Sequence, residues 1–383
     1  MCNDYGSYFS ERNSTISDAI FWWVRKYLRN TMLEFLNDND ARIIDGSEEG
    51  VSGWIMLNYV METLEESPKS LARYVRSLYT TVEPKTIGAL DLGGASMQIS
   101  FIPSQAEDIA HEDSVKKLRL YGVNYNVYSH SYLCYGDVEA KRMYIAQLIE
   151  DANFTEIIFN PCGNEGFNET VTQEDVWSPP CTNRPMDVAI PLNFTFKLVG
   201  KGNGDECRRK ALNLITGDSI PCTHQSCGLN GVFQPPVYGE FMAFSSFYYT
   251  TTGIGLGETA SMSELNQGAL DYCQRSWEDV KNTNKEEYVK TYCFNANYIY
   301  AVLVNGYKFT EDSWNIRFVR KVNGLSVSWA LGYMLNATNM IPAEAPETDT
   351  LVPSPAFIVV AVLFAVTAVI GLCLIIYHLR KRG

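Results

Sequence analysis

Residues 89–98 read ALDLGGASMQ, and this stretch decides which fold the chain can adopt. An apolar run delivers an aspartate, two glycines follow, and a small hydroxyl residue and an amide come next. We expect strands over 86–92 and 97–102, joined as a hairpin by the glycine turn. Glycines let backbone N–H groups approach a phosphate closely, and Ser96 and Gln98 alternate with Met97, so both point to one face. The pattern indicates a phosphate-binding turn, although it also fits a tight hairpin whose Asp and Gly serve turn geometry alone.

A second motif, GSEEGVSGW over 46–54, places two adjacent acids between glycines. We expect a short strand over 41–44 before this turn, a helix over 54–64 after it, and an earlier helix over 17–35. A carboxylate at such a turn can take a proton from water that attacks phosphorus. The alternative is a solvated first helical turn, where acids interact favourably with the helix dipole.

Composition narrows the class of protein. The chain has 383 residues, 46% hydrophobic and 20% charged, as in globular proteins, and its formal net charge is -13. This charge argues against a nucleic-acid binder, which needs basic clusters. It also repels free polyphosphate, so we expect a divalent cation to accompany any nucleotide substrate.

The C-terminal end indicates a membrane anchor. Residues 357–376 form an uncharged run of 20 residues, followed by Tyr377 and a basic cluster ending at Arg382. About 20 apolar residues cross a bilayer as a helix, and basic residues favour the cytoplasmic side. We expect a transmembrane helix over 357–377, a cytoplasmic tail over 378–383, and an acidic, proline-rich stalk over 342–356. The rest of the chain would lie outside the cell, at the plasma membrane.

Cysteines and glycosylation sequons support an extracellular location. Eight of the ten cysteines lie between Cys134 and Cys293, and no CxxC pair exists, which disfavours zinc. Residues 1–31 contain neither a signal peptide nor a membrane span. We therefore expect either that the true start precedes this chain or that the C-terminal helix is its only anchor. Five N-linked sequons are present, at Asn13, Asn153, Asn168, Asn193 and Asn336.

Taken in order, three segments resemble the third, fourth and fifth apyrase-conserved regions of the ecto-nucleoside triphosphate diphosphohydrolases: 46–54, 91–96 and WALGYML over 329–335. The resemblance extends over 41–377 and is greatest to the doubly membrane-anchored cell-surface members. It implies a mixed α/β fold of two ribonuclease H-like lobes, similar to actin, hexokinase and heat-shock ATPases. It also implies that nucleotide binds in the cleft between the lobes.

The resemblance implies a role for each matching residue. Glu49 falls on the general base, and Ser96 and Gln98 fall on residues that position the attacking water. Gly93, Gly94 and Ala95 match backbone donors to the phosphates, and Ser96 and Met97 are further nucleotide-binding positions of the same turn. Asp91 and Trp329 match residues that contact Ca²⁺ or Mg²⁺ through metal-bound water. Tyr249 matches an aromatic residue that stacks on the nucleobase. Core packing is the alternative for Trp329 and Tyr249.

The resemblance also implies four disulfides, while Cys2 is left over and Cys373 lies in the membrane helix. The implied pairs are Cys134–Cys181, Cys162–Cys207, Cys222–Cys227 and Cys273–Cys293. One departure from the family pattern is Asp137, where relatives commonly carry a basic residue. This acid weakens the expectation of nucleotide affinity on its side of the cleft.

A larger departure is that the first two conserved motifs of the family do not occur between Met1 and Ala41. We therefore expect a first lobe that is largely missing, with a remnant over 1–45, a second lobe over 46–319, and a segment over 320–341 that returns to the first lobe. The implied function is hydrolysis of the terminal phosphate of extracellular nucleoside tri- and diphosphates, with little activity from the chain as written. The alternative is a non-catalytic surface protein that binds nucleotide weakly or pairs with other copies through its membrane helix.

Overall fold

A computed structural model describes most of the chain: residues 14–32, 35–64, 86–104, 114–185, 188, 190–191, 193–217, 220–339 and 354–382. Two compact units result, residues 1–340 and 341–383, and each is described by itself. Three expectations lie wholly or mostly outside the described residues: the sequon at Asn13, the leftover Cys2 and the stalk expected over 342–356. Only residues 354–356 of that stalk are described, and they begin a helix instead.

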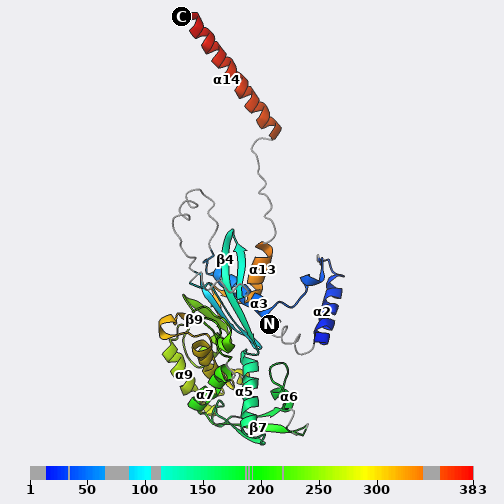
Figure 1. The fold of residues 1–383 in the computed structure, drawn as a ribbon, viewed down its shortest axis with the longest axis vertical. Helices are drawn as coiled ribbons and strands as arrows, with labels where there is room; N and C mark the ends of the chain where they lie inside the picture. The colour runs from blue at the N-terminus through cyan, green and yellow to red at the C-terminus, as the bar shows by residue number, and fades with distance from the viewer. Residues whose placement is uncertain are drawn as a thin grey trace. The chain divides into compact units, whose positions relative to one another are not determined.

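A six-stranded mixed sheet forms the centre of the first unit (Figure 1). The glycine turn joins β1 and β2 as an antiparallel hairpin, with Ala89 opposite Ser100 and Leu92 opposite Met97, which confirms the hairpin expected from the sequence. On its other side β1 pairs in parallel with β8. The order across the sheet is β3 (Val115–Leu120), β4 (Val123–Leu133), β2 (Ser96–Phe101), β1 (Gly88–Leu92), β8 (Phe241–Ser245) and β9 (Ile316–Phe318).

The two faces of this sheet bury different cores because successive strand residues point to opposite sides. One core combines Leu90, Leu92 and Met97 with the helices of the larger layer. The other core combines Ala89 and Phe244 with α3 (Gly46–Val60). The larger layer contains α5 (Asp137–Asp151), α7 (Gly204–Thr216), α8 (Ser246–Gly253), α9 (Met262–Gln274) and α12 (Tyr292–Ala301). Helices on both faces of a mixed sheet confirm the expected α/β class.

Three elements differ from the sequence expectation. Helix α3 begins at Gly46 rather than at 54, because the Asp45 carboxylate accepts the Glu48 N–H at 2.8 Å and caps the earlier turn. Helix α2 covers Ser14–Leu28 and ends before the expected residue 35. The strand expected over 41–44 is wrong, since among the described residues no strand lies beside it to complete a ladder.

A smaller three-stranded sheet lies beyond α5 and contains β5 (Ile157–Asn160), β7 (Thr195–Gly200) and β6 (Asn168–Thr172) in that order. The disulfides concentrate in this region and around α7, α9 and α12. They join the same pairs that the resemblance implies: Cys134–Cys181, Cys162–Cys207, Cys222–Cys227 and Cys273–Cys293.

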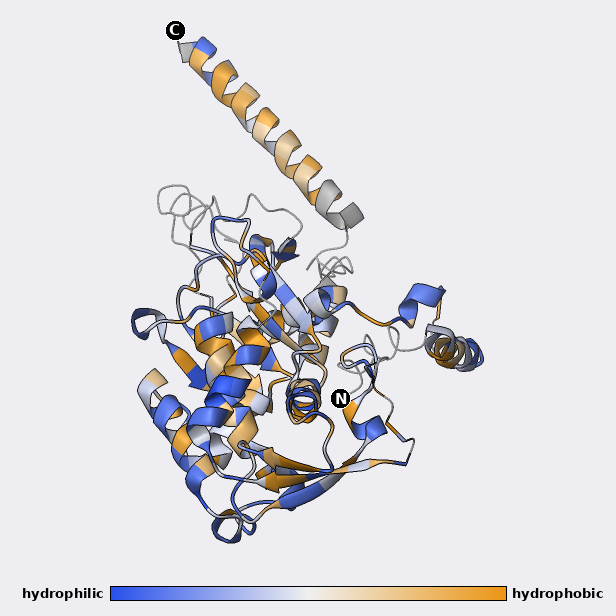
Figure 2. Ribbon diagram, turned by 60° about the horizontal axis from the view of Figure 1, so that its bottom comes forward, coloured by the Kyte–Doolittle hydropathy of each residue, from blue (hydrophilic) through white to orange (hydrophobic). Residues whose placement is uncertain are grey.

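The second unit contains the long helix α14 (Ser354–Arg382). Within it, Val359–Lys381 is long and apolar enough to cross a membrane, by length and composition. Figure 2 shows that apolar residues cover nearly all of its length and that hydrophilic residues appear at its C-terminal end.

Helix α13 (Trp329–Asn339) packs on α3 at backbone distance. A Cβ placed on Gly332 would lie 1.8 Å from the Ser52 carbonyl oxygen and 2.8 Å from the Met56 nitrogen. Only a residue without a side chain allows this approach, so Gly332 fixes the spacing of the two helices.

We expect Gly332→Ala to destabilise the first unit by about 1–3 kcal/mol or more, because the methyl group would force α13 away from the α3 backbone. Thermal unfolding of the detergent-solubilised chain measures the effect. Gly257→Ala is the matched control, since a Cβ there meets nothing within 4 Å. An unchanged Tm for Gly332→Ala would show that α13 can move away from α3 without loss of stability.

Candidate functional site

The glycine turn between β1 and β2 is held by the first turn of α5. The N–H of Asp137 donates to the Gly93 carbonyl at 2.9 Å, and the N–H groups of Val138 and Glu139 donate to the Gly94 carbonyl at 3.1 Å. In a trans peptide the N–H points opposite to the preceding C=O. The N–H groups of Gly94 and Ala95 therefore point away from α5. This is the orientation that a backbone anion site on the open side of the turn requires.

Polar side chains form a row across three strands next to this turn. Asp91 on β1 pairs with Gln98 on β2, and Gln98 pairs with Ser131 on β4, so the three side chains share one face. The Gln98 amide nitrogen donates to the Ser96 hydroxyl at 2.8 Å and to the Ser131 hydroxyl at 3.1 Å. Both amide protons are thereby used, which fixes the orientation of the amide.

The amide oxygen of Gln98 is the open end of this arrangement. It is buried, with the whole residue 1% exposed, and no hydrogen-bond partner for it is present in the described part of the structure. A buried carbonyl oxygen without a partner is costly. The site thus offers a fixed acceptor that a water or ligand hydroxyl can satisfy.

Helix α3 covers the same face through a stripe of glycines. A Cβ on Gly50 would lie 2.8 Å from the hydroxyls of Ser100 and Ser129, and one on Gly46 would lie 2.3 Å from the Ser131 hydroxyl. The Ser129 hydroxyl also donates to the Ser47 carbonyl at 3.0 Å. The α3 backbone therefore packs directly on Ser100, Ser129 and Ser131, here called the serine row. It also approaches Gln98 on the same face of the sheet, since a Cβ on Gly50 would lie 3.2 Å from the Gln98 Cβ.

The two adjacent acids of α3 have different surroundings. At 3.6 residues per turn, Glu49 lies about 60° around the helix from the sheet-facing Gly46, whereas Glu48 lies about 160° away. Glu49 is only 5% exposed, in agreement with this geometry. Glu48 instead forms two hydrogen bonds with the Arg42 guanidinium, which raise the pKa of Arg42 above its ordinary value. Glu49 is thus the acid that the helix turns toward the sheet.

The remaining expected residues lie on other elements. Tyr249 is on α8, which follows β8, and Ser245 at the end of β8 lies opposite Leu92. Tyr249 therefore belongs to the same end of the sheet as the glycine turn, and its 52% exposure argues against core packing. Trp329 begins α13, and its ring lies 6.5 Å from that of Tyr333. Trp329 therefore belongs to the helical layer on α3, outside the Ser96–Gln98–Ser131 row.

Asp137 serves the fold on the α5 side of the turn. Its carboxylate accepts from the Ser246 hydroxyl at 2.9 Å and from the Asn295 amide at 3.3 Å. These bonds join the first turn of α5 to α8 and α12. The acid that departs from the family pattern thus stabilises the helix that holds the glycine turn.

Sequence reasoning assigned no role to Ser131 or to the backbone of Ser245. Ser129 and Ser131 alternate on β4 and face the glycines of α3. Small residues in both segments were the sequence signal that the helix and the strand approach closely. Ser245 has φ 57° and ψ -130°, a region that costs a non-glycine residue on the order of 1–3 kcal/mol. Such strain at the mouth of a site has no local sequence signature.

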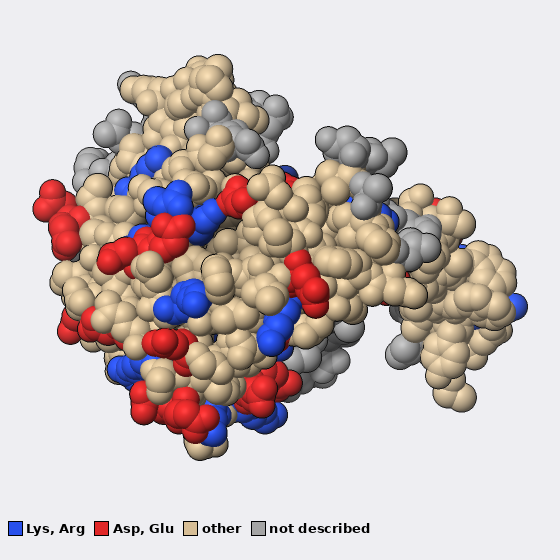
Figure 3. Space-filling model, turned by 90° about the horizontal axis from the view of Figure 1, so that it is seen from below, with Lys and Arg blue, Asp and Glu red and all other residues tan. Residues whose placement is uncertain are grey.

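Charge on one face of the molecule is mixed in sign. Figure 3 shows a face on which Lys and Arg side chains are interspersed with Asp and Glu. Together with the net charge of -13, this distribution differs from the continuous basic surface that binds nucleic acid.

Comparison with known proteins shows which family the chain resembles. The mouse "Ectonucleoside triphosphate diphosphohydrolase 3" is 35% identical over 96% of this chain and 68% of its own length. The bovine "Ectonucleoside triphosphate diphosphohydrolase 1" is 37% identical over 96% of this chain and 71% of its own length. A crystal structure of a nucleoside triphosphate hydrolase from Neospora caninum superposes with a TM-score of 0.59 at 16% identity, covering 83% of this chain and 69% of that one, which supports the fold.

A family model describes the same relationship along nearly the whole sequence. It matches residues 13–351 and so includes α3, the glycine hairpin, α8 and α13. This match confirms the family inferred from the three sequence motifs. The chain belongs to the GDA1/CD39 (nucleoside phosphatase) family.

Proposed function

We propose that this chain hydrolyses the terminal phosphate of extracellular nucleoside tri- and diphosphates, at the low rate that the sequence leads us to expect. The observation that carries the proposal is the fixed Gln98 amide, which offers a buried acceptor beneath the helix that bears Glu49. A hydrolase that uses water directly must orient that water against phosphorus. A rigid acceptor and a carboxylate on one face can each take one of its hydrogen bonds.

The chemistry follows from these positions. A water molecule donates one hydrogen bond to the Gln98 oxygen and the other to Glu49, which directs a lone pair toward the terminal phosphorus. The new P–O bond forms as the bond to the leaving phosphate oxygen breaks. The water proton passes to Glu49, and the products are inorganic phosphate and a nucleotide shortened by one phosphate. The N–H groups of Gly94 and Ala95 stabilise charge on the phosphoryl oxygens.

The donor set suits a hard divalent cation. Asp91 contributes a carboxylate at the end of β1, beside the oxygen-rich row of Gln98 and serine hydroxyls. Ca²⁺ and Mg²⁺ prefer oxygen ligands, and Mg²⁺ commonly keeps several waters. We propose that Asp91 holds such an ion, with Glu49 and Trp329 acting through its waters. When bound, the ion neutralises phosphate charge and polarises the transferring group.

The remaining proposals concern substrate position and topology. Tyr249, exposed at the same end of the sheet, would stack on the nucleobase. The apolar helix within 359–381 would anchor the chain in the plasma membrane, with residues 46–319 outside and the basic tail in the cytosol. Pairing of copies through that helix remains a separate proposal.

Intact cells that express the chain should release phosphate from added ATP and ADP above mock-transfected cells. EDTA should reduce this release to background, because the cation carries the phosphates into an acidic protein. Excess Ca²⁺ or Mg²⁺ should restore it. Phosphate release equal to mock cells in the presence of both metals would exclude hydrolysis by this chain.

Glu49→Gln should lower phosphate release by about 10²–10⁴-fold, because the amide cannot accept the proton from water. Glu48→Gln is the matched control on the neighbouring residue. This change removes the exposed ion pair with Arg42, and such a pair typically contributes ~1 kcal/mol or less to the stability of the fold. The rate of phosphate release should therefore stay within a few-fold of the wild-type rate. Nucleotide-protected thermal unfolding checks that both variants still bind. Equal losses in the two variants would remove Glu49 from the role of base.

Ser131→Ala should lower kcat about ten- to a hundred-fold with little change in KM, because the Gln98 amide can then turn away from the water. In the Gln98→Ala background the same change should have no further effect, since Ser131 acts through that amide. Ser100→Ala controls for loss of a buried hydroxyl on the same face. Additive losses in the double variant would show that Ser131 acts independently of Gln98.

A further inference from the structure

In the described part of the structure, two parts of the small sheet β5–β7–β6 are uncovered: the face that carries Phe159 and the free edge of β5. β5 and β6 are its outer strands, and each pairs only with β7 among the described strands. Proteins usually protect an outer strand with charge, with proline or by covering it. On β5, however, Ile157 is 55% exposed and Phe159 is 62% exposed. An outer strand with an apolar outward face invites pairing with another chain.

The strand register places a glycosylation sequon in the same row as this apolar face. Phe159 pairs with Val199 on β7, and Val199 pairs with Asn168 on β6. Side chains of paired residues share a face, so Asn168 lies two strands from Phe159, a spacing of about 10 Å. Asn168 and Thr170 of the sequon are both exposed on that face.

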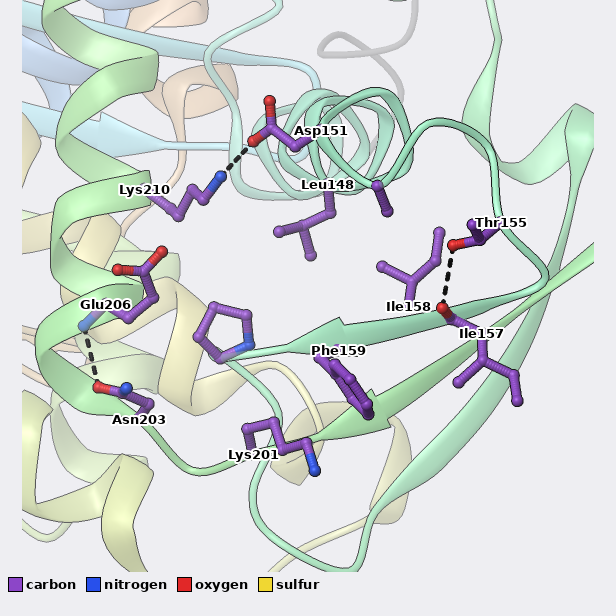
Figure 4. Close-up of a pocket in the computed structure, with 12 residues that line it drawn as sticks. Leu148, Asp151, Thr155, Ile157, Ile158, Phe159, Lys201, Asn203, Glu206 and Lys210 are labelled. Atoms are coloured by element: carbon purple, nitrogen blue, oxygen red, sulfur yellow. Dashed lines mark hydrogen bonds and ion pairs between the residues drawn. The ribbon is translucent and has the colours of Figure 1, made fainter.

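A second sequon lies at the free edge of β5. In a parallel pair of strands, every second residue hydrogen-bonds through its backbone to the neighbouring strand. The carbonyls of Glu156 and Asn160 accept from the backbone N–H groups of Lys197 and Lys201, so the even-numbered residues of this segment bond toward β7. The backbone N–H and carbonyl groups of Phe159 therefore point away from β7, toward the free edge of the sheet. Beside this edge is a hollow of about 530 Å³ between α5, α7 and β5 (Figure 4). Ala152, which precedes the exposed Asn153, and Thr155, the third residue of that sequon, both line it.

The charges around the hollow are already paired. Lys210 bonds to Asp151, as Figure 4 shows, and Glu206 bonds to Arg209. Lys201 lies 4.2 Å from the centre of the Phe159 ring. A charged ligand would have to break these contacts, so the hollow favours a neutral occupant with hydroxyl groups and apolar surfaces.

We propose that N-linked carbohydrate of this chain, on Asn168 over the face and on Asn153 at the edge, covers this sheet and prevents two copies from joining through β5. Sugar rings combine C–H surfaces, which cover Ile157 and Phe159, with hydroxyl groups, which can bond the outward backbone of β5. The inference rests on the extracellular orientation proposed above, because only luminal asparagines acquire such carbohydrate.

The test uses the full chain expressed in glycosylating cells and solubilised in detergent. Glycopeptide mass spectrometry should find Asn153 and Asn168 occupied. Light scattering after size exclusion should show several-fold more self-associated protein for Asn153→Gln/Asn168→Gln than for wild type. Enzymatic removal of N-glycans from the folded wild-type chain should have the same effect, which separates covering from folding. Phe159→Lys in the double variant should restore the wild-type distribution.

Asn336→Gln is the control, since this sequon lies on α13 and outside the small sheet. It should leave self-association unchanged. Unoccupied Asn153 and Asn168 beside an occupied Asn193 or Asn336 would overturn this inference alone, whereas carbohydrate on none of them would also overturn the extracellular orientation. Self-association that Phe159→Lys does not reverse would assign the contact to another surface.

Discussion

The arrangement depends on one contact, the approach of the α3 backbone to the serine row of the central sheet. Glycines on one side of the helix face Ser100, Ser129 and Ser131 at distances that exclude any side chain. This contact determines how far the helix stands from the sheet and how it is rotated about its axis. Gly332 repeats the arrangement on the other side of α3, where α13 approaches at backbone distance.

Chemistry at the site follows from that spacing. With α3 close to the sheet, Glu49 is buried above the polar row, and Glu48 is turned outward to Arg42. On the sheet, two serine hydroxyls hold the Gln98 amide so that its oxygen is the only end left for a ligand. The glycine turn is oriented independently by α5, whose first N–H groups donate hydrogen bonds to the carbonyls of the turn.

The second sheet has a different relation to its surroundings. The disulfide Cys162–Cys207 ties it to α7 of the helical layer, yet one of its outer strands exposes apolar side chains to solvent. Two sequons lie beside its uncovered surfaces, one in register with Phe159 and one at the edge of β5. In the proposal made above, covalent carbohydrate protects this sheet in place of protein packing.

The sequence alone determined the features that local residues specify. The hairpin over 88–101, the membrane-length helix and the family all follow from patterns within short stretches, because turn chemistry and hydrophobic length act locally. Tertiary structure alone decided which of Glu48 and Glu49 faces the sheet, that Ser131 holds Gln98, and that Asn168 shares a row with Phe159. These relations join residues distant in the chain, and the strand expected over 41–44 failed for the same reason: a strand needs a neighbour that local sequence does not specify.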